Sequence, residues 1–269
     1  MKISAINYEQ KNINFASTKR IVNDENGHCE NFTTFFRDDI NWNTFAETLN
    51  EKYKNEDKVN VYCYACSDGS EPYTLAMLLI SKLGEEAKKF FPIIAKDKDD
   101  FFLEKAKKGE VEIDLTDIKA IEKYTKKKAS DFFDIEADLS DKKNAKFVTK
   151  FKNNIKNKII FEQGNILDDI DALEKENSII LFRNAWLYLS DGEQHRLARK
   201  LKENLGKNSI NIIGDYDFKN SDVLEKMQKN ELKLKMNGNF FYYDNPSFTG
   251  RTTLNDPRYL LNIFANTSK

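Results

Sequence analysis

The sequence predicts an α/β protein with a mostly parallel β-sheet and helices on both of its faces. Short runs of β-branched and aromatic residues alternate along the chain with stretches in which apolar residues have helical spacing. This alternation is typical of a parallel sheet, because a crossover between parallel strands usually contains a helix. With 269 residues, the chain is long enough for one large α/β domain or two small ones.

The chain opens with a polar, Asn-rich segment, residues 1–30, which we interpret as an N-terminal arm. The predicted domain covers residues 31–269. Possible N-cap residues at 31–34 predict a short helix at 35–38, and a second helical pattern covers 42–53. These two helices would precede the sheet.

The first strand of the sheet is predicted from Val59 to Cys66, where β-branched and aromatic residues are frequent. A turn of small and polar residues, 67–70, follows it. Glu71-Pro72 then opens a helix that reaches Leu83, because proline fits the first turn of a helix. Gly84 ends this helix.

The later elements continue the alternation. They are strands at 91–95, 159–161, 179–182 and 210–214, helices at 99–108, 191–205 and 222–229, an antiparallel pair at 232–236 and 240–243, and a tail helix at 256–265. The stretch 110–158 interrupts the rhythm with short, Lys-rich segments, which predicts a small subdomain inserted between the two halves of the sheet. It is either a solvated excursion or a partner-binding subdomain.

The composition disfavours some partners and locations. The formal net charge is −1, which gives no overall electrostatic reason to expect nucleic acid or an anionic membrane as partner. Three cysteines do not make a disulfide framework, and no apolar run approaches the ~18–20 residues of a membrane span. The polar N-terminus lacks the apolar core of a signal peptide, so we expect a cytoplasmic location and no membrane insertion.

The strand, turn and helix from Val59 to Leu83 carry the strongest chemical signal. Small residues after a strand let backbone N–H groups approach a ligand, and the start of the next helix favours an anion. The alternative is an ordinary turn between a strand and a helix. Asp97 sits at the end of the next strand, where a carboxylate can accept hydrogen bonds from both ribose hydroxyls. The turn lacks the Gly-x-Gly-x-x-Gly fingerprint, which disfavours NAD without excluding another adenosine cofactor.

Four motifs then occur in a family-specific order. They are Asn31-Phe-Thr-Thr-Phe-Phe-Arg-Asp38, Ala65-Cys-Ser-Asp-Gly-Ser-Glu-Pro-Tyr73, Leu103-Glu-Lys-Ala-Lys-Lys-Gly109 after Asp97, and Phe182-Arg-Asn-Ala-Trp-Leu-Tyr188. In order and approximate spacing they resemble the CheR family of S-adenosylmethionine-dependent protein-glutamate O-methyltransferases. The resemblance spans Asn31 to Tyr243. It implies the class I methyltransferase fold, which is Rossmann-like, with S-adenosylmethionine as cofactor and S-adenosylhomocysteine as product.

The resemblance also assigns roles to residues of this chain. Cofactor contacts are expected from Thr33, Arg37, Ala65, Gly69, Glu71, Asp97, Asn165, Ile166, Arg183 and Asn184. Asp97 would bind the ribose, and Asn165 and Ile166 would flank the adenine. Thr33 and Arg37, four residues apart, would face the site from one side of the first helix.

Arg37 and Tyr188 are the expected catalytic residues. In the family the acceptor is a glutamate side chain of a receptor, and its carboxylate oxygen attacks the methyl of a sulfonium. A carboxyl group with a pKa of about 4.3 is ionised at neutral pH, so no general base is needed. The site must supply alignment, which can contribute about 7–11 kcal/mol. Arg37 offers a two-pronged donor to the acceptor or to the cofactor carboxylate, and Tyr188 offers a hydroxyl that orients the reacting oxygen.

Plainer alternatives accompany these assignments. Arg37 could be an exposed helix cation that pairs with Asp38 or Asp39, and Tyr188 a buried aromatic at a strand end. No metal site is predicted. Cys63 and Cys66 lie in a core strand as small apolar residues, and the acidic cluster at 168–171 is typical of a helix start.

The sequence departs from the family pattern in three places. Residues 1–30 are too short for the usual N-terminal helical domain, Gly-Glu-Glu-Pro is replaced by Gly69-Ser70-Glu71-Pro72, and Gly-His-Ser-Glu is replaced by Gly214-Asp215-Tyr216-Asp217. The expected function is O-methylation of a protein glutamate, with the cytoplasmic region of a chemoreceptor as the candidate partner. One alternative is a methyltransferase of the same fold that acts on another protein or on a small molecule. Another is a non-catalytic interaction module that binds S-adenosylmethionine.

Overall fold

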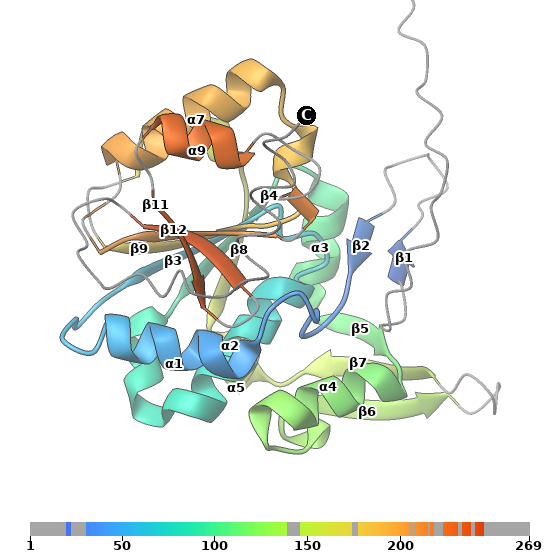
Figure 1. The fold of residues 1–269 in the computed structure, drawn as a ribbon. Helices are drawn as coiled ribbons and strands as arrows, with labels where there is room; N and C mark the ends of the chain where they lie inside the picture. Colours follow the sequence, from blue (N-terminus) through green and yellow to red (C-terminus); the bar gives the residue numbers. More distant parts are fainter. Residues whose placement is uncertain are drawn as a thin grey trace, which may run out of the picture.

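The centre of the computed structural model is a seven-stranded sheet with the order β11-β12-β10-β9-β3-β4-β8. The structure describes residues 20–22, 31–138, 146–173, 177–204, 206, 208–214, 216–217, 223–230, 233–237 and 240–244. In sheet order the strands are β11 (Lys233–Asn237), β12 (Phe240–Asp244), β10 (Ile210–Ile213), β9 (Ser178–Phe182), β3 (Asn60–Tyr64), β4 (Ile93–Asp97) and β8 (Ile159–Gln163) (Figure 1). β12 runs antiparallel to β10 and β11, and the strand pairs from β10 to β8 are parallel. This sheet confirms the predicted fold class.

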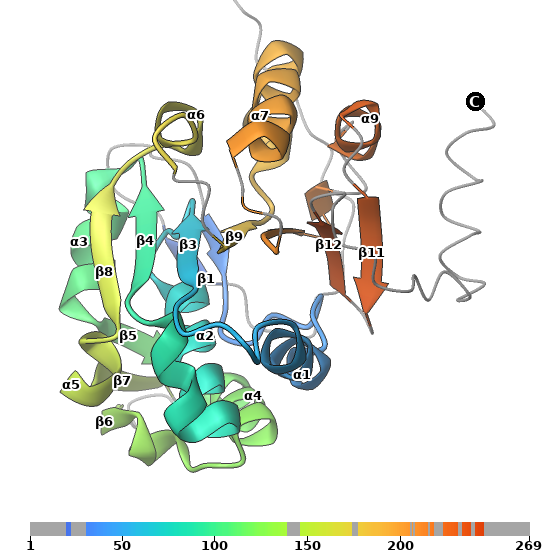
Figure 2. The same cartoon turned by 90° about the vertical axis from the view of Figure 1, so that its left-hand side faces the viewer.

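Helices cover both faces of the sheet (Figure 2). One face carries α1 (Trp42–Lys52), α2 (Ser70–Leu83) with the 3₁₀ helix η1 (Gly84–Phe90), and α3 (Asp100–Lys108). The other carries α6 (Ile166–Asp169), α7 (Asp191–Asn204) and α9 (Val223–Lys229). Successive side chains of a strand point to opposite faces. In β9, Ile179 and Leu181 therefore join the apolar cluster on the α2 side, and Ile180 and Phe182 join the cluster on the α7 side.

The predicted elements of the central sheet have counterparts in the structure, with shifts of a few residues at their ends. The antiparallel pair predicted near the C-terminus is β11 and β12. Asp97 is the last residue of β4 and so lies at the end of this strand, as predicted, although β4 continues past the predicted end at Ala95. The tail helix predicted at 256–265 lies outside the described residues.

The short helix predicted at residues 35–38 is wrong. Asn31–Thr33 form β2, which pairs with β1 (Arg20–Val22) inside the segment interpreted as an arm, and turns follow. Phe36 has a φ of 46°, outside the helical region. The turn lets two adjacent rings pack in different directions, Phe35 against Phe133 and Phe151, and Phe36 against Trp42 and Tyr124. Thr33 and Arg37 therefore do not share a helix face.

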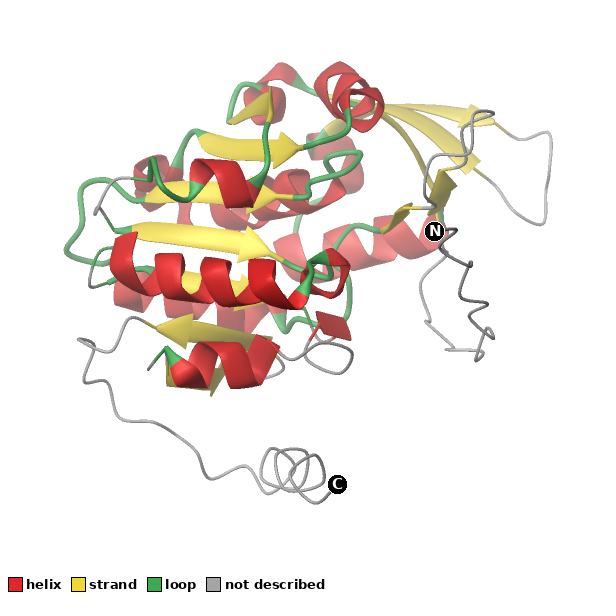
Figure 3. Cartoon of the chain, turned by 90° about the horizontal axis from the view of Figure 1, so that it is seen from above, coloured by secondary structure: helices red, strands yellow, loops and turns green. Residues whose placement is uncertain are grey.

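Between α3 and β8 the chain forms a second, antiparallel sheet with the order β5-β7-β6. This stretch contains β5 (Glu110–Ile113), α4 (Leu115–Thr125), the 3₁₀ helix η2 (Ala129–Asp131), β6 (Phe133–Asp138), β7 (Lys146–Phe151) and α5 (Asn153–Lys156). The rings of Tyr73 in α2 and Phe151 in β7 are stacked with their centroids 3.7 Å apart, which joins this sheet to the rest of the molecule. Figure 3 shows the small sheet and the antiparallel pair of β1 and β2 beyond the carboxyl ends of the central strands.

The chain order reverses between β3 and β9. From β3 the chain continues to β4 and β8 on one side, and β9 and β10 then build the other side. In open α/β sheets, ligands bind outside the carboxyl ends of the strands at such a reversal. The fold therefore points to the segments that follow β3 and β9.

Candidate functional site

Segments that follow the carboxyl ends of β3, β4, β9 and β10 contact one another at this reversal. The segment after β3 contacts the end of β4 through Ser67 and Asp97. The segment after β9 contacts the start of α2 through Arg183 and Glu71, and it contacts the segment after β10 through Asn184 and Asp217. The turn before α1 joins them through Asp39.

Asp97 holds the turn after β3. Its carboxylate accepts hydrogen bonds from the backbone N–H of Ser67 at 2.8 Å and of Asp99 at 3.0 Å. Ala65 and Ser67 have φ values of 54° and 51°, so the turn has an unusual backbone that needs such support. Burial raises the pKa of Asp97, and the backbone N–H donors oppose this shift. Asp97 thus lies where the sequence predicts a ribose partner, and Ala65 is exposed in the same turn.

Gly69 begins α2 with a φ of 85°. A Cβ atom at this position would lie 3.1 Å from each of three neighbours, Ala106 Cβ, Phe161 Cζ and Tyr73 Cδ2. Any other residue would therefore be strained and crowded. The structure shows that Gly69 lets α2 start close to α3 and β8, and its predicted contact with a cofactor stays a prediction.

Arg183 is a buried cation between two carboxylates. Its guanidinium donates to Glu71 and, at 2.5 Å, to Asp39, and it lies over the Trp42 ring at 5.6 Å from the ring centroid. Burial acts to lower the pKa of Arg183, but the charges of Asp39 and Glu71 outweigh it and hold the pKa above its ordinary value. Arg183, which is predicted to contact the cofactor, thereby ties Glu71 to the turn before α1.

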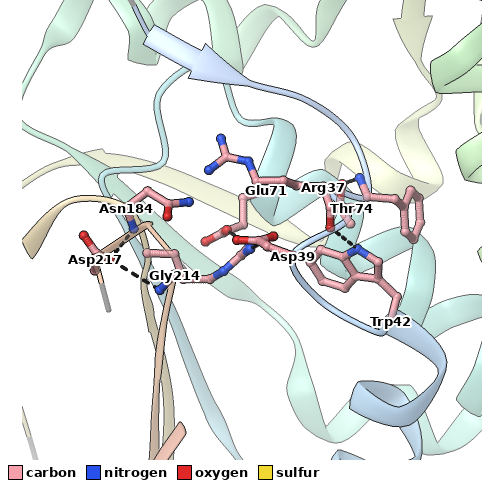
Figure 4. Close-up of polar contacts among 10 residues, drawn as sticks. Arg37, Asp39, Trp42, Glu71, Thr74, Asn184, Gly214 and Asp217 are labelled. Carbon is pink, nitrogen blue, oxygen red and sulfur yellow. Dashed lines mark hydrogen bonds and ion pairs between the residues drawn. The ribbon is translucent and has the colours of Figure 1, made fainter. Parts of the chain in front are cut away.

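Arg37 lies on the turn that precedes α1. The turn is fastened at two points: Phe36 N–H donates to Thr74 Oγ1 at 3.1 Å, and the carbonyl oxygen of Arg37 accepts from Trp42 Nε1 at 2.9 Å. Figure 4 shows the Arg37 side chain pointing toward the region of Glu71 and Asn184. The structure therefore brings Arg37 to the same region as Glu71. Thr33 is buried at the end of β2.

Asn184 and Tyr188 lie on the segment after β9. Asn184 has a φ of 56°, and its backbone N–H donates to the carboxylate of Asp217. Tyr188 ends the 3₁₀ helix η3 (Trp186–Tyr188) and is 74% exposed, so the alternative of a buried aromatic is wrong. The backbone turns at η3 and carries the ring out of the core. The role of Tyr188 beside a reacting carboxylate stays a prediction.

Asn165 and Ile166 lie at the start of α6. The Asn165 side chain caps this helix by accepting from Leu167 N–H at 3.1 Å. Ile166 is 1% exposed and packs in the cluster on the α7 side. Gly164 N–H donates to the carbonyl oxygen of Asp97 at 3.0 Å, so this segment adjoins the predicted ribose partner. Its predicted contact with adenine stays a prediction.

The polar atoms at these strand ends fit an adenosyl sulfonium, which presents hydroxyl, amino and carboxylate groups. Buried side-chain atoms without a hydrogen-bond partner in the described part of the chain include Ser67 Oγ, Ser70 Oγ, Arg183 Nε and Asn184 Oδ1. Such atoms are rare in folded proteins unless a ligand or water satisfies them. They lie on the segments predicted to hold the cofactor.

A family model described as "CheR methyltransferase, SAM binding domain" matches residues 31–237. The chain belongs to this CheR family. The match confirms the family predicted from the four motifs, and with it S-adenosylmethionine as the cofactor.

Curated relatives of the CheR chain include chemotaxis proteins. A "Chemotaxis protein methyltransferase" of Borreliella burgdorferi is 28% identical over 191 residues, which cover 68% of this chain and 63% of the relative. A relative of the same description from Listeria monocytogenes is 24% identical over 187 residues, which cover 68% of this chain and 64% of that protein. The CheR chain thus spans less than two thirds of the length of these relatives.

Solved structures of methyltransferases also resemble the CheR chain. One from Methanococcus maripaludis, described as an S-adenosyl-L-methionine-dependent methyltransferase, is 14% identical. The similarity covers 79% of this chain and 87% of that one, with a TM-score of 0.42.

Sequence reasoning missed three residues that shape this CheR site. Asp39 was considered only as a partner of Arg37, but it pairs with Arg183. Asp217 was treated as part of a departure from the family motif, although a carboxylate at that motif's last position was a usable signal. Nothing in the sequence singles out Thr74.

A small cavity adjoins the site on the side of the inserted sheet. Its volume is about 120 Å³, and it lies between the turn before α1 and α4, lined by Phe35, Phe36, Asp38, Thr116, Asp117, Ala120, Lys123 and Tyr124.

Across the segments that the structure describes, no helix is both long and apolar enough to span a bilayer.

Proposed function

We propose that this chain transfers a methyl group from S-adenosylmethionine to a carboxylate of a protein, and that the acceptor is a glutamate in the cytoplasmic region of a chemoreceptor. The observation that supports the proposal most is the meeting of Arg37, Glu71 and Arg183, which come from three of the family motifs, at the reversal of strand order. The names of the curated relatives support the acceptor class. A cytoplasmic location follows from this acceptor.

The charges of the site suit the two reactants. When bound, S-adenosylmethionine supplies a methyl group on a positively charged sulfur. Asp39 and Glu71 carry two negative charges and Arg183 carries one positive charge, which leaves one net negative charge in this buried cluster. That charge favours a cation beside it. Arg37, on the neighbouring turn, supplies a positive charge for the acceptor carboxylate or for the carboxylate of the cofactor.

Asp97 and Tyr188 complete the proposed roles. An ionised carboxylate has about four acceptor positions, so Asp97 can hold Ser67 and Asp99 and still accept hydrogen bonds from ribose hydroxyls. Tyr188 is exposed on the segment after β9 that also carries Arg183, and in this proposal its hydroxyl donates to an incoming carboxylate oxygen. The acceptor needs no general base, because its carboxyl group is already ionised at neutral pH.

The proposal is tested by incubating the chain with S-adenosylmethionine labelled in the methyl group and with chemoreceptor cytoplasmic fragments of its host. We expect label that is released by base, as methyl esters are. Stable label would indicate a different acceptor group, and binding of S-adenosylhomocysteine without any transfer would indicate a non-catalytic module. Either result would reject the proposed reaction.

Arg37→Ala separates the two roles left open for this side chain. If Arg37 orients the acceptor, the variant keeps the affinity for S-adenosylhomocysteine, measured by calorimetry, and loses transfer. If Arg37 holds the cofactor carboxylate, the affinity for S-adenosylhomocysteine and the methyl transfer fall together. Lys54→Ala, which removes an exposed cation from the turn after α1, is the matched control and should change neither the affinity nor the transfer.

A further inference from the structure

Asp217 is a carboxylate that lies wholly inside the protein. Its side chain is 0% exposed and lies in the short segment after β10. It accepts hydrogen bonds from the backbone N–H groups of Asn184, of Trp186 at 2.9 Å and of Gly214 at 3.3 Å. One side chain thus fixes the segments that leave two neighbouring strands, β9 and β10.

Such an arrangement is costly for the fold unless it has a use. A buried carboxylate is unfavourable even when backbone N–H groups surround it, and here burial raises the pKa of Asp217 to about 7 against the opposing effect of those donors. A neutral side chain could fill the same space. The carboxylate is distinguished from it by its capacity to accept several N–H donors at once.

The backbone that Asp217 holds is strained and tightly packed. Asn184 adopts a φ of 56°, and a Cβ atom on Gly214 would come within 2.0 Å of Asn184 Oδ1 and 2.8 Å of the Asn184 backbone nitrogen. The same backbone carries the Asn184 side chain, whose Oδ1 is buried and has no hydrogen-bond partner. A residue in this conformation persists only where its surroundings enforce it.

We propose that Asp217 is a positioning residue: it holds Asn184 in the left-handed conformation that places the Asn184 side-chain amide beside the bound cofactor. The inference rests on the proposed function, because it requires that the site binds S-adenosylmethionine. Asp217 itself touches neither reactant. It acts through the backbone of the segment after β9.

The test uses Asp217→Asn and Asp217→Glu in the full chain. Asparagine keeps the shape but replaces one acceptor oxygen with a donor that opposes the N–H groups. We expect Asp217→Asn to weaken binding of S-adenosylhomocysteine by about tenfold or more, because charge-assisted hydrogen bonds that order the site are lost. Asp217→Glu restores the carboxylate, and we expect it to recover most of the affinity. Circular dichroism and thermal unfolding establish that each variant is folded.

Asp114→Asn is the matched control. Asp114 also accepts two backbone N–H groups, from Thr116 at 2.6 Å and from Asp117 at 2.9 Å, but it caps α4 in the inserted subdomain. Its substitution should leave the affinity unchanged. Wild-type affinity in folded Asp217→Asn would overturn the proposal, and so would equal losses in the Asn and Glu variants. If the wild type itself does not bind S-adenosylhomocysteine, the proposed function fails instead.

If Asp217→Asn does not fold, hydrogen exchange of the wild type tests whether Asp217 holds the segment after β9. In the wild type, the amides of Asn184 and Trp186 should exchange slowly, and S-adenosylhomocysteine should slow the Asn184 amide further. Exchange of these two amides at the rate of an exposed loop would show that the carboxylate does not hold this segment.

Discussion

Non-glycine residues with a left-handed backbone gather around the candidate site. Phe36, Ala65, Ser67 and Asn184 have φ values of 46°, 54°, 51° and 56°, and each lies on a turn or a connection at the reversal of strand order. This conformation costs roughly 1–2 kcal/mol for a residue with a Cβ atom. Asparagine tolerates it better than most residues, which accounts for the residue type at position 184. Backbone strain is therefore frequent on the segments that are predicted to bind the cofactor.

Two substitutions at Asn184 separate its backbone from its side chain. Asn184→Gly adopts a positive φ freely, whereas Asn184→Ala does not, so we expect the alanine variant to be less stable by about 1 kcal/mol. Both lack the side-chain oxygen and should lose affinity for S-adenosylhomocysteine to a similar degree. Urea unfolding and calorimetry measure the two effects. Equal stability of the variants would contradict the strained conformation.

Asp217 should make stability depend on pH. Its folded-state pKa of about 7 lies above its ordinary value of 3.8, so the folded protein binds this proton more tightly than the unfolded chain does. The resulting contribution to stability is fully present below about pH 4 and is lost as the pH rises through about 7. We therefore expect the unfolding free energy of the wild type, relative to that of Asp217→Asn, to fall between about pH 4 and about pH 7. A difference that is constant with pH would argue against the raised pKa.

At the scale of elements, α2 acts as the anchor for the turn before α1. Thr74 lies in the middle of α2 and is 0% exposed, and its hydroxyl oxygen accepts the Phe36 N–H. Because the turn is not helical, its backbone groups need such external partners. The position of Arg37 thus depends on a side chain of a helix that is distant in sequence.

Thr74→Val removes this acceptor without changing the shape of the side chain. An unsatisfied buried N–H costs about 1–3 kcal/mol, so we expect the free energy of unfolding to fall by that amount. Thr48→Val in α1 is the control, because the Thr48 hydroxyl donates to the carbonyl oxygen of Thr44, within the same helix, at 2.8 Å. Urea denaturation should distinguish the two. A loss of the same size in both variants would mean that the Phe36 contact contributes nothing specific.

The turn before α1 is a segment that the sequence alone does not predict correctly. Periodic patterns predicted β3, α2, β9 and α7 because their apolar spacing is set by local geometry and by burial on known faces. The helix expected at 35–38 did not form, since Phe35 and Phe36 fill separate pockets whose walls come from the inserted sheet and from α1 and α4. Contacts between segments that are distant in sequence determine the conformation of residues 35–38, and the motif alone does not indicate these contacts.

At the scale of the whole molecule, Arg183 joins the two halves of the sheet. It follows β9 and binds Asp39 and Glu71, which belong to the half that contains β3. The family motifs identified Arg183 and Glu71, but not that they form an ion pair or that Asp39 completes it. Such a pair depends on how the halves meet, which the overall fold class does not specify.

Arg183→Met tests this connection. Its removal leaves two carboxylates without their shared cation in a buried site, so we expect a loss of about 3–5 kcal/mol in the free energy of unfolding. Arg196→Met is the control. Arg196 pairs with Asp171 at 2.9 Å while 45% of its side chain is exposed, and exposed pairs of this kind contribute about 0–1 kcal/mol. Similar stabilities of the two variants would show that Arg183 does not join the halves.

The division between strand interiors and strand ends affects how such a chain can evolve. Apolar residues inside the strands and helices hold the molecule together. Asn184 and Tyr188 lie on the connection that leaves β9, and Arg37 lies on the turn before α1. Substitutions at exposed positions of these segments, such as Tyr188, leave the packed interior intact. Preference for a new acceptor can therefore arise by mutation while the scaffold keeps its folding stability. The exposed positions of these segments are the natural target for directed evolution.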